Sequence, residues 1–190
     1  MDASLRGTGL PPGQREVARA PVLHVGDVPV FDPHTWDLSV EGEVERTLRL
    51  AWRDVSALPR VTRTADLHGA TGWSARGLRW EGVPLAAILE ACAPRERARF
   101  LIARDRDGYC ASLPLEALDP QAVLLATALD GVPLSAAHGA PLRLLVPERY
   151  AWKSVKWLRR LEFLAQDEPG FWERRGAHPS ADPWLGQRVL

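Results

Sequence analysis

Alternation between apolar and polar positions, the period of a strand with one buried face, recurs along most of the chain. The strands that it predicts cover 38–40, 47–50, 61–67, 78–80, 100–103, 109–113, 123–129, 142–146 and 158–164, and Glu41-Gly42 makes the first two a hairpin. Helical spacing is confined to Trp52, Val55 and Leu58 before Pro59, and to Leu85, Ile88, Leu89 and Cys92 after Pro84. Strands outnumber helices and do not alternate regularly with them. The pattern therefore predicts a mixed α+β fold and not a doubly wound sheet.

The distribution of periodic segments predicts one domain with two appendages. A chain of 190 residues is long enough for one well-filled core and short for two domains. Residues 1–21 are rich in Pro, Gly and Arg without periodicity, so we expect an irregular surface arm. The periodic segments fall within 22–166, the expected domain, and the turn-rich residues 167–190 are expected to form a partly ordered tail packed on it.

Charge and cysteine content narrow the classes of partner and compartment. Lys plus Arg and Asp plus Glu both total 24, so no net field favours nucleic acid or an anionic membrane. No apolar run approaches the roughly 20 residues of a membrane-spanning helix. The first residues lack the apolar stretch of a secretory signal, and two cysteines are too few for a disulfide framework. We expect a cytoplasmic protein without a membrane span or a nucleic-acid partner.

Two segments carry positive charge in a pattern suited to an anionic, ring-bearing ligand. Residues 149–157 hold three cations, one hydroxyl and three aromatic rings, which can bind phosphate through charged hydrogen bonds and stack on a heterocycle. His138 can donate to or accept from a heterocycle edge, and Arg143 can hold an anion with two parallel bonds. The residues alone leave the alternatives open, because a cation-rich loop is commonly a solvated face and Arg143 could pair with a carboxylate.

A third segment, residues 66–74, carries further polar side chains, and its residues 68–74 are predicted to form a loop directly after the strand 61–67. The polar side chains of His68 and Thr71 could line a pocket there, or could equally satisfy the backbone of their own loop. Asp66 is expected to be structural, because an acid beside a histidine commonly fixes its tautomer or closes a turn.

These motifs together resemble the molybdopterin-binding domain of the sulfite oxidase family, especially its short bacterial members. The matching patterns are Lys-Ser-x-Lys at 153–156, His-Gly-x-Pro-x-Arg at 138–143, and Asp-x-His-Cys-Val-Thr-Gly-Trp-Ser at 66–74, with Leu10-Pro11-Pro12-Gly13-Gln14 also found near the start of short relatives. The resemblance spans about 10–184. It implies the mixed-sheet fold of that family around a single molybdopterin carrying molybdenum. The residues that it implies for cofactor binding are His138, Arg143, Lys153, Ser154 and Lys156, with His24 as a looser match; His68, Thr71 and Tyr109 would lie near the metal.

The chain departs from the 66–74 pattern at the position of its cysteine. Gly69 stands where the family has the cysteine whose thiolate is the protein's only bond to molybdenum, and glycine offers no ligand atom. Three explanations remain open: a natural loss or change of activity, an engineered substitution, or a metal ligand that comes from elsewhere or from solvent. Cys110 is the candidate substitute, although a free thiol is more commonly packed as a small hydrophobe. Cys92, on the apolar helix face, is expected in the core.

The family implies two-electron oxygen-atom transfer to or from a small substrate such as sulfite or a sulfoxide, with electrons passing to a separate partner. The alternative is a non-catalytic protein that binds, carries or senses molybdopterin or another phosphorylated pterin, and a third possibility is a scaffold with an empty pocket. Restoring the ligand by Gly69→Cys is expected to restore or raise oxygen-atom transfer if the rest of the pocket is intact.

Overall fold

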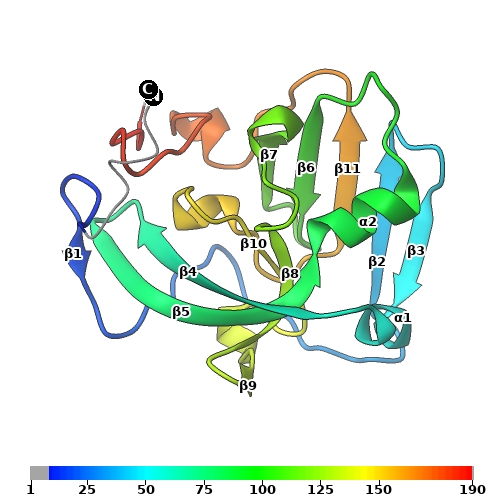
Figure 1. Cartoon of the computed structure of the whole chain (residues 1–190), viewed down its shortest axis with the longest axis horizontal. Helices are drawn as coiled ribbons and strands as arrows, with labels where there is room; N and C mark the ends of the chain where they lie inside the picture. The colour runs from blue at the N-terminus through cyan, green and yellow to red at the C-terminus, as the bar shows by residue number, and fades with distance from the viewer. Residues whose placement is uncertain (1–8, 190) are drawn as a thin grey trace.

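The computed structural model describes residues 9–189, so the first eight residues of the predicted arm and the last residue of the tail lie outside it. Two β-sheets face each other across the main core (Figure 1). One sheet joins β1 (Arg15–Glu16), β4 (Val61–Gly69), β5 (Trp73–Pro84), β8 (Leu124–Leu129), β9 (Val132–Pro133) and β10 (Arg143–Leu145). The other has the order β3 (Leu48–Ala51), β2 (Asp37–Gly42), β11 (Arg160–Leu164), β6 (Phe100–Arg104) and β7 (Cys110–Pro114). The mixed α+β prediction is confirmed.

The helices of the described chain are all short. The two α-helices are α1 (Trp52–Ala57) and α2 (Leu85–Cys92), and the 3₁₀ turns are η2 (Leu115–Ala117), η3 (Ala136–His138), η4 (Ala151–Lys153) and η5 (Glu173–Arg175). Both α-helices lie where the spacing predicted them, and Cys92 is buried on the core face of α2 as expected. No helix within residues 9–189 is long and apolar enough to cross a membrane.

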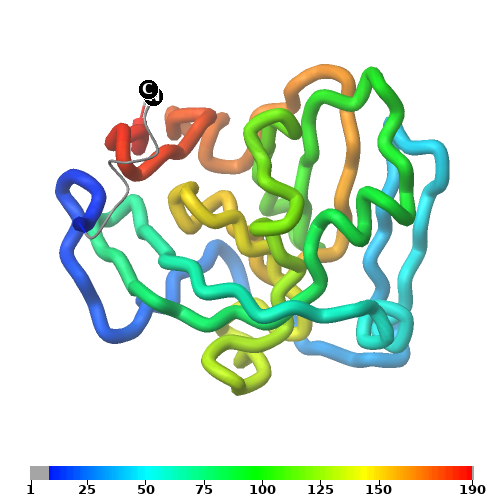
Figure 2. The backbone as a smooth tube through the Cα atoms, in the orientation of Figure 1, coloured from blue at the N-terminus to red at the C-terminus, as the bar shows by residue number. Residues whose placement is uncertain are grey.

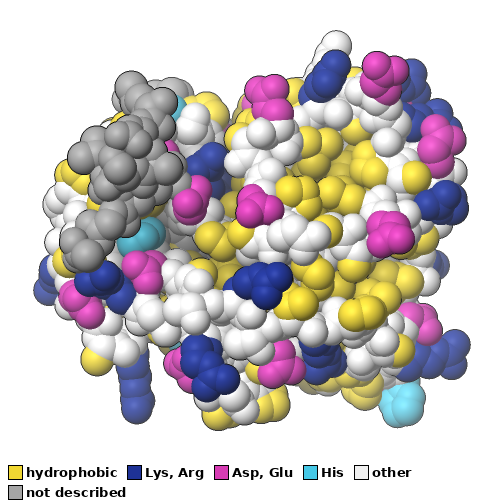
Figure 3. Space-filling model, in the orientation of Figure 1, with side chains coloured by type: hydrophobic (Ala, Val, Ile, Leu, Met, Phe, Trp, Pro, Cys, Tyr) yellow, Lys and Arg dark blue, Asp and Glu magenta, His cyan; other side chains and the backbone are white. Residues whose placement is uncertain are grey.

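Buried apolar side chains form two clusters. The larger lies between the sheets and beneath α2, and includes Leu38, Ile88, Leu125 and Phe163. The smaller gathers around two tryptophans and consists of Leu67, Trp73, Ala75, Trp80, Leu124, Ala126, Leu134 and Leu145. We call this second set the tryptophan cluster. On the outer face seen in Figure 3, acidic and basic side chains are interspersed, as the balanced composition predicts.

The prediction of a loop over 68–74 is wrong, because β4 and β5 form one long antiparallel hairpin whose turn takes only residues 70–72. The prediction that the following strand covers only 78–80 is also wrong, since β5 continues to Pro84 through a bulge at Glu81 and Gly82. Gly82 does not form a turn. It allows β8 to approach β5 closely, because a Cβ at this position would overlap the Leu125 carbonyl. The arm, expected to be irregular, adds β1 to the sheet parallel to β5.

Both ends of the described chain meet at the β4–β5 turn (Figure 2). In the arm, the backbone N–H groups of Arg15 and Val17 donate to Gly72 and Ser74 at 3.0 and 2.9 Å. From the other end, Arg188 donates to the carbonyls of Pro12 and Gly13, each at 3.2 Å. The arm and the residues after β11 therefore enclose this end of the hairpin.

Candidate functional site

The loop between η3 and β10 brings three basic side chains together: His138, Arg143 and Lys156, which we call the cation cluster. Gly139 makes this convergence possible. Its φ is +106°, a conformation that favours glycine, and a Cβ there would lie 3.0 Å from Arg143 Cβ and 3.2 Å from Lys156 Cα. The sequence patterns 138–143 and 153–156, fifteen residues apart at their first positions, thus meet in space.

Arg143 is buried without a carboxylate. Its Nη1 and Nη2 donate to the carbonyls of His138 and Ser154, each at 3.1 Å, and its guanidinium lies 5.4 Å from the centre of the Trp80 ring. The Nε atom is buried and has no hydrogen-bond partner among the described residues. Burial lowers the pKa of Arg143 to about 10, so the group stays charged at neutral pH.

Lys156 is the second uncompensated cation. Its ammonium donates to the carbonyls of Leu23 and Ala137 at 2.9 and 2.7 Å. Burial and, second, the charge of Arg143 lower the pKa of Lys156 to about 8. Within residues 9–189, no carboxylate lies within 4.0 Å of either cation.

The histidines adjoin these cations. His138 is half-buried, bonds through Nδ1 to the Ser135 hydroxyl at 2.7 Å, and has its pKa lowered by burial and by Lys156 and Arg143. His24 is exposed, and its ring meets the edge of Trp157 at 5.4 Å between centroids. The structure therefore gathers His24, His138, Arg143 and Lys156 from three separate segments.

Lys153 and Ser154, expected to bind phosphate, are engaged inside the protein. The Lys153 ammonium donates to the Ser112 carbonyl at 2.6 Å and forms a buried ion pair with Glu173 of the tail. Burial lowers the pKa of Lys153, and Glu173 opposes that shift. The Ser154 hydroxyl accepts the N–H of Val146 at 3.0 Å. Glu173 was not anticipated from the sequence, because nothing in its spacing links it to Lys153.

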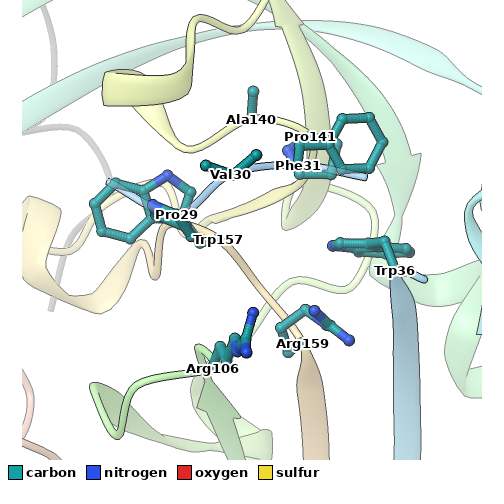
Figure 4. Close-up of a pocket in the computed structure, with 9 residues that line it drawn as sticks. All are labelled: Pro29, Val30, Phe31, Trp36, Arg106, Ala140, Pro141, Trp157 and Arg159. Carbon is teal, nitrogen blue, oxygen red and sulfur yellow. The ribbon is translucent and has the colours of Figure 1, made fainter. Parts of the chain in front are cut away.

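A small cavity of about 20 Å³ lies beside the cation cluster (Figure 4). Its walls include Trp157 and the Ala140-Pro141 segment that follows Gly139, with the guanidinium groups of Arg106 and Arg159 facing Phe31 and Pro141 across it. Arg159 is held by Asp37, whereas Arg106 is exposed. This volume suits a water molecule and not a pterin.

The β4–β5 turn carries a second group of polar contacts. Buried His68 bonds through Nδ1 to the Ser74 hydroxyl at 2.7 Å, and that hydroxyl donates to Gln14 Oε1 at 3.3 Å. Since the hydroxyl has one proton, His68 Nδ1 is the donor and its Nε2 the acceptor. Burial lowers the pKa of His68, although Asp66 opposes the shift, so the imidazole is neutral at pH 7.

Gln14 completes this network by donating from Nε2 to the Gly69 carbonyl at 3.0 Å. Its role was not foreseen, and the available signal was its place in the Leu10 to Gln14 pattern shared with short bacterial relatives. Thr71 lies apart from the network, because it is exposed at the tip of the turn.

Trp73 occupies the space beside Gly69. A Cβ on Gly69 would fall inside the indole ring, overlapping Cε2 and Nε1. The backbone of Gly69 does not have a positive φ, so glycine is required here by space and not by conformation. The indole is buried, and its N–H has no acceptor among the described residues.

Tyr109 joins the two parts of the site. Its hydroxyl donates to the Trp152 carbonyl at 2.6 Å, and burial raises its pKa so that it stays protonated. Trp152 stacks on Tyr150 at 5.1 Å, and Tyr150 pairs with His68 through an isolated bridge. The indole N–H of Trp152 is also buried and unpaired within the described chain.

Cys110 does not stand among metal ligands in this structure. Its buried thiol accepts a contact from Arg174 Nη2 at 3.6 Å. Over residues 9–189 there is no group of three His, Cys, Asp or Glu side chains that could hold a metal ion.

The donor set of the site fits one part of a molybdopterin and does not fit the other. His138, Arg143 and Lys156 lie together, and the two cations have no carboxylate partner among the described residues, which suits a phosphorylated heterocycle. At position 69 there is neither a ligand atom nor room for one. The residues therefore match the phosphate and pterin and do not match the metal.

Fold and site together define a two-sheet protein with a cluster of cations that have no carboxylate partner among the described residues, and sequence comparison assigns its family. The profile described as "Oxidoreductase molybdopterin binding domain" matches residues 25–172, so the chain belongs to this molybdopterin oxidoreductase family. The "Uncharacterized oxidoreductase YuiH" of Bacillus subtilis is 42% identical over 180 residues, 94% of this chain and 91% of that protein. Mitochondrial sulfite oxidase of Mus musculus is 33% identical over 188 residues, covering 82% of this chain.

The structural comparison agrees. The sulfane dehydrogenase SoxCD of Paracoccus pantotrophus superposes with a TM-score of 0.67 and 25% identity, over 78% of this chain and 42% of that one. The predicted sulfite oxidase-type fold is confirmed. This chain spans 34% of the mouse sulfite oxidase, so it corresponds to one part of that longer protein.

Proposed function

We propose that this protein binds molybdopterin, with the cation cluster holding the phosphate and the neighbouring pterin. The observation that carries this proposal is the pair of cations, Arg143 and Lys156, that lie together without a carboxylate among residues 9–189. The like charges of buried Arg143 and half-buried Lys156 repel each other, and a dianionic phosphate removes that repulsion while accepting their hydrogen bonds. The imidazoles of His138 and His24 stand beside these cations and complete the proposed binding set.

Lys153 and Ser154, which are buried, are proposed to hold the cation cluster in position. Lys153 is anchored to Glu173, so in this proposal it fixes the segment that presents Ser154 and Lys156. Ser154 in turn holds the Val146 N–H and, through its carbonyl, Arg143. Both remain proposed cofactor-binding residues, acting through the position of the two free cations.

The first candidate activity is the reaction class of the family. When bound with molybdenum, the cofactor supplies two-electron oxygen-atom transfer, here with a small sulfite-like or sulfoxide-like substrate and a separate electron partner. Neutral His68 offers an acceptor at Nε2, and protonated Tyr109 and exposed Thr71 complete the residues proposed near the substrate. We propose a cytoplasmic location for this activity.

The second candidate is binding without turnover, as a carrier or sensor of molybdopterin or a related phosphorylated pterin. Gly69 favours this candidate, because the chain supplies no bond to the metal at the family position. The geometry therefore supports binding more strongly than catalysis.

The pterin content of purified protein tests the proposal. The chain and two variants are purified from a host that makes the cofactor, and bound pterin is measured by fluorescence after oxidative release. Lys156→Met is expected to lower the pterin content at least about tenfold, since a hydrogen bond to a charged group contributes about 1.5–3 kcal/mol. Arg53→Met removes a cation on α1 whose side chain is 89% exposed, and is expected to change nothing. Equal pterin in both variants, or none in the unmodified chain, would contradict the proposal.

A further inference from the structure

Residues 18–31, which we call the strap, run between β1 and β2 without backbone support (Figure 1). Before them, the Val17 N–H donates to the Ser74 carbonyl at 2.9 Å, and after them the Asp32 carbonyl accepts the Trp36 N–H at 3.0 Å. Among residues 9–189, no backbone N–H or carbonyl of the strap pairs with another backbone group. Folded chains average about one internal hydrogen bond per residue, so the strap belongs to the part of the molecule that opens at low cost in free energy.

Hydrophobic burial also contributes little to holding the strap. Burial contributes roughly 25 cal/mol per Å² of apolar surface removed from water, so side chains left in solvent add little to stability. Val30, for example, is 93% exposed. The exposed large apolar side chains of the strap are those of Val22, Leu23, Val25, Val28, Val30 and Phe31.

Lys156 joins the strap to the cation cluster. Its ammonium donates to the Leu23 carbonyl of the strap at 2.9 Å and to the Ala137 carbonyl at 2.7 Å. An ammonium has three protons to donate, so one remains for a phosphate oxygen. Lys156 can therefore hold the strap in its observed position and bind a ligand at the same time.

Two ring contacts complete the attachment of the strap. The His24 ring meets the edge of Trp157 at 5.4 Å between centroids. At the end of the strap, the Phe31 ring meets the edge of Trp52 on α1, also at 5.4 Å. An aromatic pair contributes only about 0.5–1.5 kcal/mol beyond its buried area, so neither contact fixes the strap firmly.

The cavity beside the cation cluster is too small for the proposed ligand. Its volume is about 20 Å³, whereas pockets that hold small organic ligands measure about 300–1,000 Å³. Residues 29–31 of the strap form one wall of this cavity, and Trp157 with Pro141 forms another (Figure 4). At least one of these walls must therefore move before a phosphorylated pterin can reach the cations.

The wall that faces the strap is fixed. The Trp157 indole N–H donates to the Ala136 carbonyl, and the Leu158 N–H donates to the Leu142 carbonyl, each at 2.8 Å. Leu142 and Leu158 are fully buried members of the main core. A close-packed core resists displacement, so the strap is the wall that can open.

We propose that the strap is a cover, which opens to admit a phosphorylated pterin to the cation cluster and closes again over the bound molecule. In the closed form, Lys156 and His24 contact both the strap and the ligand. This inference rests on the proposed binding of molybdopterin. It predicts that the ligand enters and leaves only while the strap is open, so the opening of the strap sets both rates.

Phe31→Ala tests this proposal, because it weakens the strap and leaves the proposed binding residues unchanged. If the ligand passes only through the open form, a variant that favours this form raises the association and dissociation rate constants by the same factor and leaves the Kd unchanged. Stopped-flow fluorescence of the full chain with hydroxymethylpterin monophosphate is expected to show both rate constants raised about 2- to 12-fold, the effect of losing one aromatic pair. Val132→Ala, the control, shortens an exposed side chain on β9 and is expected to change neither rate constant.

Limited proteolysis tests the proposal on the unmodified protein. Trypsin can cleave after Arg19, an exposed residue of the strap. Saturating hydroxymethylpterin monophosphate is expected to slow this cleavage at least about tenfold, because a hydrogen bond from His24 to the charged phosphate favours the closed strap. Cleavage after arginines outside the strap serves as the reference.

Unchanged rate constants in Phe31→Ala, or a change in dissociation alone, would overturn the strap as a cover. Cleavage after Arg19 at the same rate with and without ligand would overturn it as well. The proposed function would stand in each of these outcomes, because the protein would still bind the pterin. No binding by the unmodified protein would overturn the proposed function and this inference with it.

Discussion

The pH dependence of ligand binding follows from the state of Lys156. Burial and the nearby Arg143 lower the pKa of Lys156 to about 8, and only the charged ammonium attracts phosphate. A phosphate monoester has a second pKa near 6, so it is dianionic at pH 7 and above. Binding is therefore strong below the pKa of Lys156 and weakens as pH rises through it.

The size of the effect can be worked out from that pKa. With a pKa of about 8, roughly nine-tenths of Lys156 is charged at pH 7 and roughly one-tenth at pH 9, so affinity falls about tenfold, or about 1.4 kcal/mol. Neighbouring groups do not titrate in this interval: Arg143 has a pKa of about 10, that of Tyr109 is raised, and that of His138 is lowered. Lys156 therefore accounts for the predicted change.

Titration of the metal-free, ligand-free protein with a phosphorylated pterin, followed by its fluorescence between pH 7 and 9, measures this effect. Lys156→Arg keeps the charge throughout and is expected to abolish the fall, whereas Arg53→Met is expected to retain the unmodified profile. A flat profile for the unmodified protein, or the same fall in Lys156→Arg, would refute the reasoning.

In the ligand-free protein, Lys156 affects folding stability in the opposite direction: its contribution grows as pH rises, whereas ligand binding weakens. The folded-state pKa of Lys156 lies below its unfolded value near 10.4, so the unfolded chain binds more protons between these values. The contribution of Lys156 to the free energy of unfolding therefore rises with pH across this window.

Two further predictions concern stability. Lys153→Met leaves Glu173 buried without a partner, so it is expected to lower the free energy of unfolding, measured in urea, by about 3–5 kcal/mol. Adding Glu173→Leu is expected to recover part of this loss. A loss no larger than that of an exposed substitution would show that the ion pair is not structural. Gly139→Ala is expected to lower the melting temperature more than Gly176→Ala. Both glycines have a positive φ, but only at Gly139 would the added Cβ meet neighbouring atoms. Equal changes in melting temperature would mean that backbone strain alone matters.

The sequence predicted the elements whose periodicity is local. The hairpin β2–β3 pairs Leu38 with Leu50 as the alternation indicated, and α2 buries Ile88 and Cys92. The long hairpin β4–β5 was divided wrongly into strands over 61–67 and 78–80, and it contains glycines at 72, 77 and 82. Gly72 and Gly77 have a positive φ, whereas Gly82 allows close contact with β8. The sequence alone does not distinguish these two roles of glycine.

The candidate site was predictable only in part, for a related reason. Patterns in sequence indicated the cations that gather around Gly139. They could not distinguish Lys156, which bonds only to carbonyls among the described residues, from Lys153, which is neutralised by Glu173 twenty residues away. The overlap of Trp73 with position 69 depends on how the hairpin folds back on itself. Contacts of this kind arise from tertiary packing and produce no periodic pattern in the sequence.

The place of β11 in its sheet has a consequence for biosynthesis. This strand lies between β2 and β6, parallel to the first and antiparallel to the second. At about 5–20 residues per second, synthesis from the end of β6 to the end of β11 takes roughly 3 to 12 s, during which both neighbours expose unpaired edges. The nascent chain is therefore most prone to aggregate in this interval, and its yield in a cell is expected to depend on chaperones that bind exposed strands.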